Sequence, residues 1–194
     1  MRLWSYQHPA VLKTLQKGER YVCTWDCVPD KQWHTAYCWM VRQMAERGIP
    51  IGEHAPVWAW HSVNLDGGKP DDLCAISLLS EIQLEEGIDF FELEVPDHLA
   101  LPSCYGAWNG MLDDFIDDVA PVAKKVADCF AESLRPRRSR PPQYFPDIQA
   151  CLPYLEPAWL VAWETLASER LLEERRVYIE KLQPLYPPHQ ISAL

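Results

Sequence analysis

Leu3-Trp4-Ser5-Tyr6-Gln7, close to the start of the chain, is the stretch that decides how the fold begins. It predicts a short first strand, followed at once by a helix. Pro9 stands where a helix accepts proline in its first turn, and Gly18 stands where helices commonly stop. The apolar face of this helix would consist of Val11, Leu12 and Leu15.

A second helix and a second strand follow. Asp30 can cap the helix, since its carboxylate accepts hydrogen bonds from N–H groups of the first turn, and Gly48 with Pro50 ends it. Its apolar stripe consists of Trp33, Tyr37, Met40, Val41 and Met44. Residues 57–63 then alternate with period two, which predicts a strand. One face of it would carry Val57, Ala59, His61 and Val63, and the other Trp58, Trp60 and Ser62.

The middle of the chain holds its strongest strand signal. Residues 66–68 supply a glycine turn, and residues 73–84 fit a strand and a short helix equally well. Residues 88–95 alternate clearly and stop at Pro96. One face of this strand would carry Phe91, Leu93 and Val95, and the other Glu92 and Glu94.

The C-terminal half is predicted to be mainly helical. Ser103 can cap a helix whose apolar side consists of Tyr105, Trp108, Met111, Leu112 and Phe115. Pro121 opens another helix to about Leu134, and residues 135–142 predict an exposed basic, proline-rich loop. Pro157 would start a helix carrying Trp159, Trp163 and Leu166, which continues or restarts to bury Leu171, Leu172, Tyr178, Ile179 and Leu182.

Composition agrees with one α+β domain spanning residues 1–194. Of these 194 residues, 48% are hydrophobic and 24% charged, which is ordinary for a domain that buries its own core. Nine tryptophans and seventeen prolines are its unusual features. We expect a small split antiparallel or mixed sheet flanked by helices, with a helical C-terminal part.

Charge and cysteine usage narrow the function classes. The net charge of −10 argues against a broad nucleic-acid surface, because phosphate binding depends on Lys and Arg displacing counterions. The start at Met1 lacks the segments of a signal peptide, and the seven cysteines are an odd number, so we expect reduced thiols in the cytoplasm. No apolar run approaches the roughly 18–20 residues that span a bilayer, so we expect no membrane association.

Four stretches together resemble a family of uncharacterised bacterial proteins whose members open with a Leu-Trp-Thr-Ile-Gln-like strand. They are residues 3–7, residues 36–40 (Ala-Tyr-Cys-Trp-Met), residues 56–60 (Pro-Val-Trp-Ala-Trp) and residues 91–97 (Phe-Glu-Leu-Glu-Val-Pro-Asp). The likeness covers the chain to about residue 115, and residues 190–194 resemble a shortened form of the last strand of that family.

The element order also resembles the ADP-ribosyltransferase-like fold. This resemblance implies an NAD ligand held by a polar residue on the first strand and an aromatic side chain behind the nicotinamide. Gln7, Tyr6 and Trp60 match these roles. Active members place a glutamate on a late strand, but none stands beside Gln190 here, so catalysis stays open, with Glu94 as the candidate.

Two pairs of residues on predicted strands suit a binding site. Trp58 and Trp60 could line a cleft for a planar ligand, because flat side chains provide stacking area, or could pack beneath a helix. Glu92 and Glu94 suit acid or base roles, although paired carboxylates on a strand commonly face solvent.

Cys23, Cys27, His34 and Cys38 offer the thiolate and imidazole ligands that tetrahedral zinc prefers. Their C-x3-C-x6-H-x3-C spacing departs from the usual C-x2-C pairs, and a domain of this size folds without a metal. We therefore expect core thiols here and no zinc.

Asp113, Asp114, Asp117 and Asp118 fit the aspartate-rich pattern that holds magnesium and a diphosphate in some large helical enzymes. The predicted strands disfavour that class. We read the cluster as a solvated acidic face that could dock onto a basic protein surface.

Two functions remain. One is binding of an NAD-like nucleotide, with or without ADP-ribosyltransferase-like catalysis. The other is a non-enzymatic interaction protein, an inhibitor or regulator from a mobile element, that docks through the acidic face. The chain has no phosphate-binding loop, nucleophile elbow or metalloprotease histidine pair, which disfavours the familiar NTPases and hydrolases.

Overall fold

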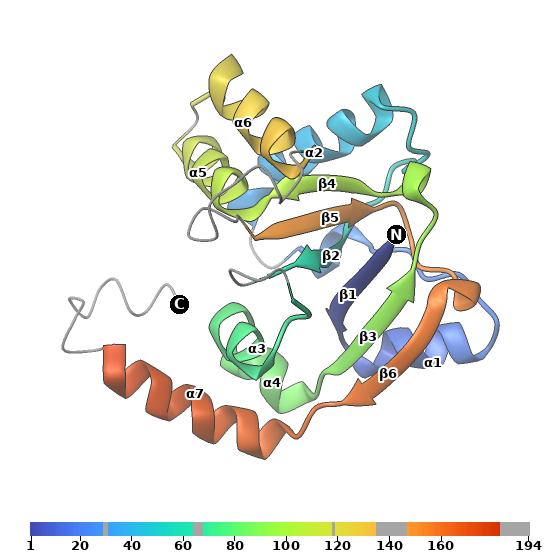
Figure 1. Cartoon of the computed structure of the whole chain (residues 1–194), viewed down its shortest axis with the longest axis vertical. Helices are drawn as coiled ribbons and strands as arrows, with labels where there is room; N and C mark the ends of the chain where they lie inside the picture. Colours follow the sequence, from blue (N-terminus) through green and yellow to red (C-terminus); the bar gives the residue numbers. More distant parts are fainter. Residues whose placement is uncertain (29–30, 64–67, 118, 135–146, 183–194) are drawn as a thin grey trace.

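The computed structural model describes residues 1–28, 31–63, 68–117, 119–134 and 147–182, which form an open sheet surrounded by helices (Figure 1). The strand order is β4-β5-β2-β1-β3-β6, and every neighbouring pair is antiparallel. The α+β class is thus confirmed, and of the two predicted sheet types the sheet is antiparallel. The strands are β1 (Arg2–Gln7), β2 (Val57–Ser62), β3 (Asp89–Glu94), β4 (Leu101–Cys104), β5 (Ile148–Leu152) and β6 (Leu160–Thr165).

Helices form two groups in addition to α1. Figure 1 shows α2, α5 and α6 gathered beside β4 and β5, whereas α3, α4 and α7 lie together at the other end of the molecule. In the part of the chain that the structure describes, no helix is both long and apolar enough to cross a membrane. The helices are α1 (Pro9–Gln16), α2 (His34–Glu46), α3 (Asp72–Leu78), α4 (Glu81–Glu86), α5 (Tyr105–Ile116), α6 (Ala123–Leu134) and α7 (Ser168–Leu182).

The first strand lies inside the sheet because it pairs on both sides. β1 has β2 on one side and β3 on the other. Its register with β3 is continuous, from Arg2 opposite Glu94 to Gln7 opposite Asp89. Since β1 is antiparallel to both of its neighbours, its end meets the starts of β2 and β3 at one end of the sheet.

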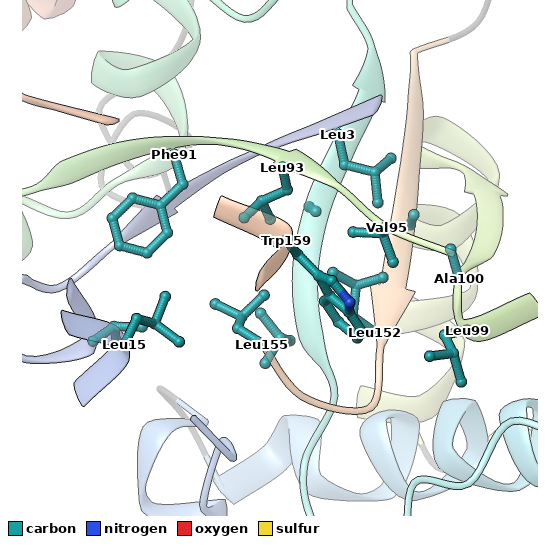
Figure 2. Packing of buried hydrophobic residues seen from close by; sticks show 14 of the residues in the cluster. Leu3, Leu15, Phe91, Leu93, Val95, Leu99, Ala100, Leu152, Leu155 and Trp159 are labelled. Carbon is teal, nitrogen blue, oxygen red and sulfur yellow. The ribbon is translucent and has the colours of Figure 1, made fainter. Parts of the chain in front are cut away.

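One core cluster lies against a single face of these strands (Figure 2). Leu3, Phe91 and Leu93 are fully buried in it and pack with Leu15 of α1 and with Trp159, which precedes β6. Successive strand residues point to opposite faces, so Leu3 of β1 and Phe91 and Leu93 of β3 enter the same cluster. The apolar faces predicted for the first helix and for residues 88–95 are confirmed.

Two further clusters attach the helix groups to the opposite face of the sheet. Met40 and Trp108 join α2 and α5 beside Trp58 of β2. Leu84 and Leu171 join α4 and α7 beside Tyr6 of β1. The two helix groups therefore cover different parts of that face.

Residues 72–86, most of which the sequence left open, form two short helices. The carboxylate of Asp71 accepts a hydrogen bond from the backbone N–H of Cys74 at 3.0 Å and caps α3. Ser80 forms a capping box with Gln83 at the start of α4. Because both starts have capping residues, local hydrogen bonding favours helix over strand.

The helix predicted from Pro157 to Leu166 is wrong. Pro157 opens only a short 3-10 turn, and β6 follows as an edge strand paired with β3. Trp159 is 8% exposed and Trp163 is 50% exposed, so the two tryptophans do not share one buried face. Backbone pairing with β3 prevails over their helical spacing. The predicted helix restarts as α7, in which Leu171 is fully buried.

The predicted helix cap at Ser103 is also wrong. Ser103 lies fully buried in β4, opposite Gln149 of β5, and α5 follows Cys104 without a side-chain capping bond. Neither β4 nor β5 was predicted. The helix itself is confirmed, with Trp108 buried as expected.

The alternation predicted for residues 57–63 breaks near its end. Val57 and Ala59 are buried as predicted. His61 is exposed, and the pairing of β2 with β5 shifts register between Trp60 and Ser62. A register shift of this kind re-aims side chains within a strand, which explains the error.

Four predicted features lie outside the described residues. They are the Asp30 cap, residues 66 and 67 of the glycine turn, the basic loop at 135–142, and residues 190–194.

The substitution Phe91→Ala tests the core built on β3. We expect it to lower the free energy of unfolding by about 3–5 kcal/mol, because a fully buried phenyl ring leaves a cavity. Ile82→Ala is the control: Ile82 is 67% exposed, and its loss should change stability by less than about 0.5 kcal/mol. Urea denaturation measures both, and similar values for the two variants would contradict this packing.

Candidate functional site

A pocket of about 390 Å³ opens at the end of the sheet where β1 stops and β2 and β3 start. Its walls come from the end of β1, the start of α1, residues 21–28, α2, the start of β2, and residues 79–88. Its volume falls within the roughly 300–1,000 Å³ of small-molecule sites. The pocket lies between the two helix groups, since Tyr37 of α2 and Gln83 of α4 both line it.

Gln7 is held in this pocket by a chain of two hydrogen bonds. Its Nε2 donates to Ser5 Oγ at 2.6 Å, and Ser5 Oγ donates to the carbonyl of Trp58 at 2.7 Å. Ser5 is 1% exposed, so this link between β1 and β2 is shielded from water. The amide of Gln7 is therefore positioned before any ligand arrives.

Tyr37 and Trp58 give the same pocket an aromatic wall. The rings of Tyr37 and Trp58 meet edge to face with centroids 5.6 Å apart, and Trp58 packs on Trp108 at 5.1 Å. Burial raises the pKa of Tyr37, so its hydroxyl stays neutral. Trp58 therefore does both things that the sequence allowed: it packs beneath helices and it lines the pocket.

Tyr6 forms another part of the wall. Its hydroxyl donates to the carbonyl of Asp71 at 2.8 Å, and its ring lies 4.8 Å from that of Phe90. Burial raises the pKa of Tyr6 well above its ordinary value. Tyr6 thus supports the pocket and holds the start of α3 against the sheet.

Some polar residues of the pocket, among them His8, Gln83 and Glu86, were not predicted. His8 caps α1 by accepting a hydrogen bond from Ala10 N–H at 3.1 Å, and Gln83 and Glu86 belong to α4. Two features of the sequence could have pointed to them. His8 directly follows the first strand, and Gln83 lies in residues 73–84, which fit both a strand and a helix. Glu86 is exposed, and it is a carboxylate that lines the pocket.

Two of the four residues of the proposed zinc set line the pocket. They are Cys23 and Cys27, whereas His34 packs against Trp25 with ring centroids 5.6 Å apart and Cys38 is exposed on α2. Across the residues that the structure describes, no three histidine, cysteine or acidic side chains form a group that could hold a metal. The zinc set is therefore not brought together.

Trp60 and Glu94 lie outside the pocket lining. Trp60 packs edge to face against Tyr105, with ring centroids 5.0 Å apart. Glu94 stands at the far end of β3, 58% exposed, with its carboxylate 3.2 Å from the amino group of Met1. The predicted set of Tyr6, Gln7, Trp58 and Trp60 is thus brought together for three of its four members.

The acidic face is only partly solvated. Asp114 accepts two hydrogen bonds from Lys125 Nζ, at 2.6 and 2.7 Å, and this joins α5 to α6. Asp113 and Asp117 are exposed, and Asp118 lies outside the described residues. The apolar residues exposed nearby are Ile116, Val119 and Val122. Docking of a basic partner at this face stays a prediction.

The sheet, its helices and this pocket define an α+β protein with a candidate small-molecule site between two helix groups. The chain belongs to a family described as a domain of unknown function (DUF3841), whose profile matches residues 2–124. Searches of curated proteins and of solved structures gave no match. Membership confirms the predicted relation to an uncharacterised family, but nothing found supports the resemblance to ADP-ribosyltransferases.

The family profile covers the pocket but not the whole sheet. Every residue that lines the pocket lies inside it, whereas β5 and β6 lie beyond it. β5 pairs with both β2 and β4, so the sheet is completed by residues outside the matched region. The candidate site therefore belongs to the family part of the chain.

Ser5→Ala tests the link that positions Gln7. We expect a loss of about 1–3 kcal/mol in unfolding free energy, because the Trp58 carbonyl loses a buried donor. Gln7→Ala keeps the bond from Ser5 to Trp58 and should cost less than about 1 kcal/mol. If thermal denaturation gave the two variants equal losses of unfolding free energy, the bond from Ser5 to Trp58 would not be the stronger contribution.

Proposed function

We propose that this protein binds a nucleotide-like ligand of the NAD class in the pocket at the end of β1. The observation that carries the proposal is that one pocket is lined both by the aromatic rings of Tyr37 and Trp58 and by the fixed amide of Gln7. A planar heteroaromatic ring gains stacking area from such a wall and hydrogen bonds from such an amide.

The lining of the pocket suits the ring and ribose part of the ligand. Its polar lining residues include His8, Gln83 and Glu86, and none of the lining residues in the described part of the chain is lysine or arginine. A carboxylate such as Glu86 can accept hydrogen bonds from ribose hydroxyls. The first-turn N–H groups of Ala10 and Val11 in α1 are already paired with His8. The ligand's phosphates would therefore face solvent.

The proposal concerns binding. The carboxylate predicted for catalysis, Glu94, stands at the other end of β3 from the pocket. Glu86 is a pocket carboxylate, and a transferase reaction at this site would use it in place of Glu94. We therefore propose ligand binding at this pocket and no particular reaction.

Thermal unfolding with added ligands tests the proposal. NAD, ADP-ribose, adenosine and nicotinamide should each be added at millimolar concentration, because a ligand that binds only the folded state stabilises it by about 2.7 kcal/mol at a hundredfold excess over Kd. We expect the melting temperature to rise with at least one of these four compounds, each of which carries a planar heteroaromatic ring. Gln7→Ala should weaken its binding about tenfold, which is about 1.4 kcal/mol.

Glu94→Gln is the matched control, because it changes a glutamate outside the pocket and should leave affinity unchanged. Glu86→Gln, inside the pocket, should lower it. The absence of a shift with all four compounds would refute the proposal, and so would equal affinity in wild type and Gln7→Ala.

A further inference from the structure

One wall of the pocket, residues 21–28, carries two thiols on a fixed backbone. Tyr21 exchanges two backbone hydrogen bonds with Leu155, both 2.9 Å, and the carbonyl of Cys23 accepts from Ala55 N–H at 3.1 Å. A 3-10 turn, Trp25–Cys27, then brings the chain round. This turn sets Cys23 and Cys27 in the pocket wall, four positions apart.

Cys27 has the surroundings of a reactive thiol. Its Sγ lies 3.6 Å from Thr24 Oγ1 and 3.8 Å from the hydroxyl of Tyr21, and the residue is exposed. Burial on its own would raise the pKa of Cys27, but hydrogen bonds from Thr24, Tyr21 and Cys23 outweigh it, and the pKa lies below its ordinary value. Hydroxyl donors that stabilise a thiolate favour nucleophilic sulfur.

Cys23 is the complementary partner. Its side chain interacts with that of Cys27, and burial, to which the charge of Cys27 adds, raises its pKa to about 12. Cys23 therefore stays protonated beside a neighbour whose pKa is lowered. This asymmetry is typical of a thiol pair in which one sulfur attacks first and the other follows.

The remaining cysteines differ from this pair. Burial raises the pKa of Cys74 to about 11 and of Cys129 to about 12, and it raises that of Cys151 further. Cys104 is buried. Cys38, exposed on α2, is the natural comparison thiol, since it is accessible and does not line the pocket.

We propose that Cys27 and Cys23 form a thiol–disulfide exchange site that accepts low-molecular-weight disulfides in the pocket. The thiolate of Cys27 attacks one sulfur of the small disulfide, whose S–S bond breaks, and the first small thiolate leaves with the electron pair. Cys23 then passes its proton to the first released thiolate and attacks Cys27 Sγ, so the mixed S–S bond breaks and the second small thiolate leaves and takes a proton from water. Two protein thiols are oxidised, and one small disulfide is reduced to two thiols. The proposal does not depend on nucleotide binding.

Oxidised glutathione is the probe that tests this site. The reduced full-length protein is incubated with it near neutral pH, and intact mass and peptide mapping follow the products. We expect wild type to lose two hydrogens, release two glutathiones per chain and contain a peptide that links Cys23 to Cys27. Cys23→Ser should stop at a glutathione adduct on Cys27, because the second attack is lost.

Controls keep the test independent of folding defects. Thr24→Val retains both sulfurs and should slow modification of Cys27 by about two- to threefold, because the thiolate fraction falls while its nucleophilicity rises. Cys38, within the same molecule, should react more slowly than Cys27. Faster modification of Cys38 would overturn the proposal, and so would a wild-type protein that stops at the mixed disulfide or does not react.

Discussion

The backbone ladder between β1 and β3 is the interaction on which the rest of the structure depends. It pairs every residue of β1, from Arg2 to Gln7, and it places Gln7 opposite Asp89 at one end of the sheet. The same register sends Leu3, Phe91 and Leu93 into a common core. One set of backbone hydrogen bonds therefore determines both the packing of the domain and the location of its pocket.

The pocket exists because two helix groups cover different parts of one sheet face. Trp58 belongs to the cluster of α2 and α5, and Tyr6 belongs to the cluster of α4 and α7. The pocket includes the end of β1, where Gln7 extends from the sheet face that also carries Leu3 and is tied to β2 through Ser5. The aromatic wall is thus an extension of the core, which makes it rigid without a ligand. The thiols of residues 21–28 complete this wall from another segment.

The first strand and most of the longer helices were predicted from the sequence. Apolar alternation and the positions of prolines lie within one element and need no knowledge of distant residues. β5, with only five residues, is held between β2 and β4 by pairing distant in sequence, and no local pattern reveals it. Tyr6 and Gln7 were predicted from the fold resemblance and Trp58 from the alternation of its strand, and all three line the pocket. Glu94 was misplaced relative to the pocket because strand direction within the sheet, which a single sequence does not reveal, decides which end of β3 faces it.

The pocket at the end of β1 is preformed and suits a planar ligand. A crystal structure of the protein with bound NAD would show whether the ligand occupies it. We expect the ligand ring to lie against Tyr37 and Trp58, with Gln7 within hydrogen-bond distance of the ring or its carboxamide. A ligand seated elsewhere, such as beside Trp60 and Tyr105 with the pocket at β1 unoccupied, would contradict it.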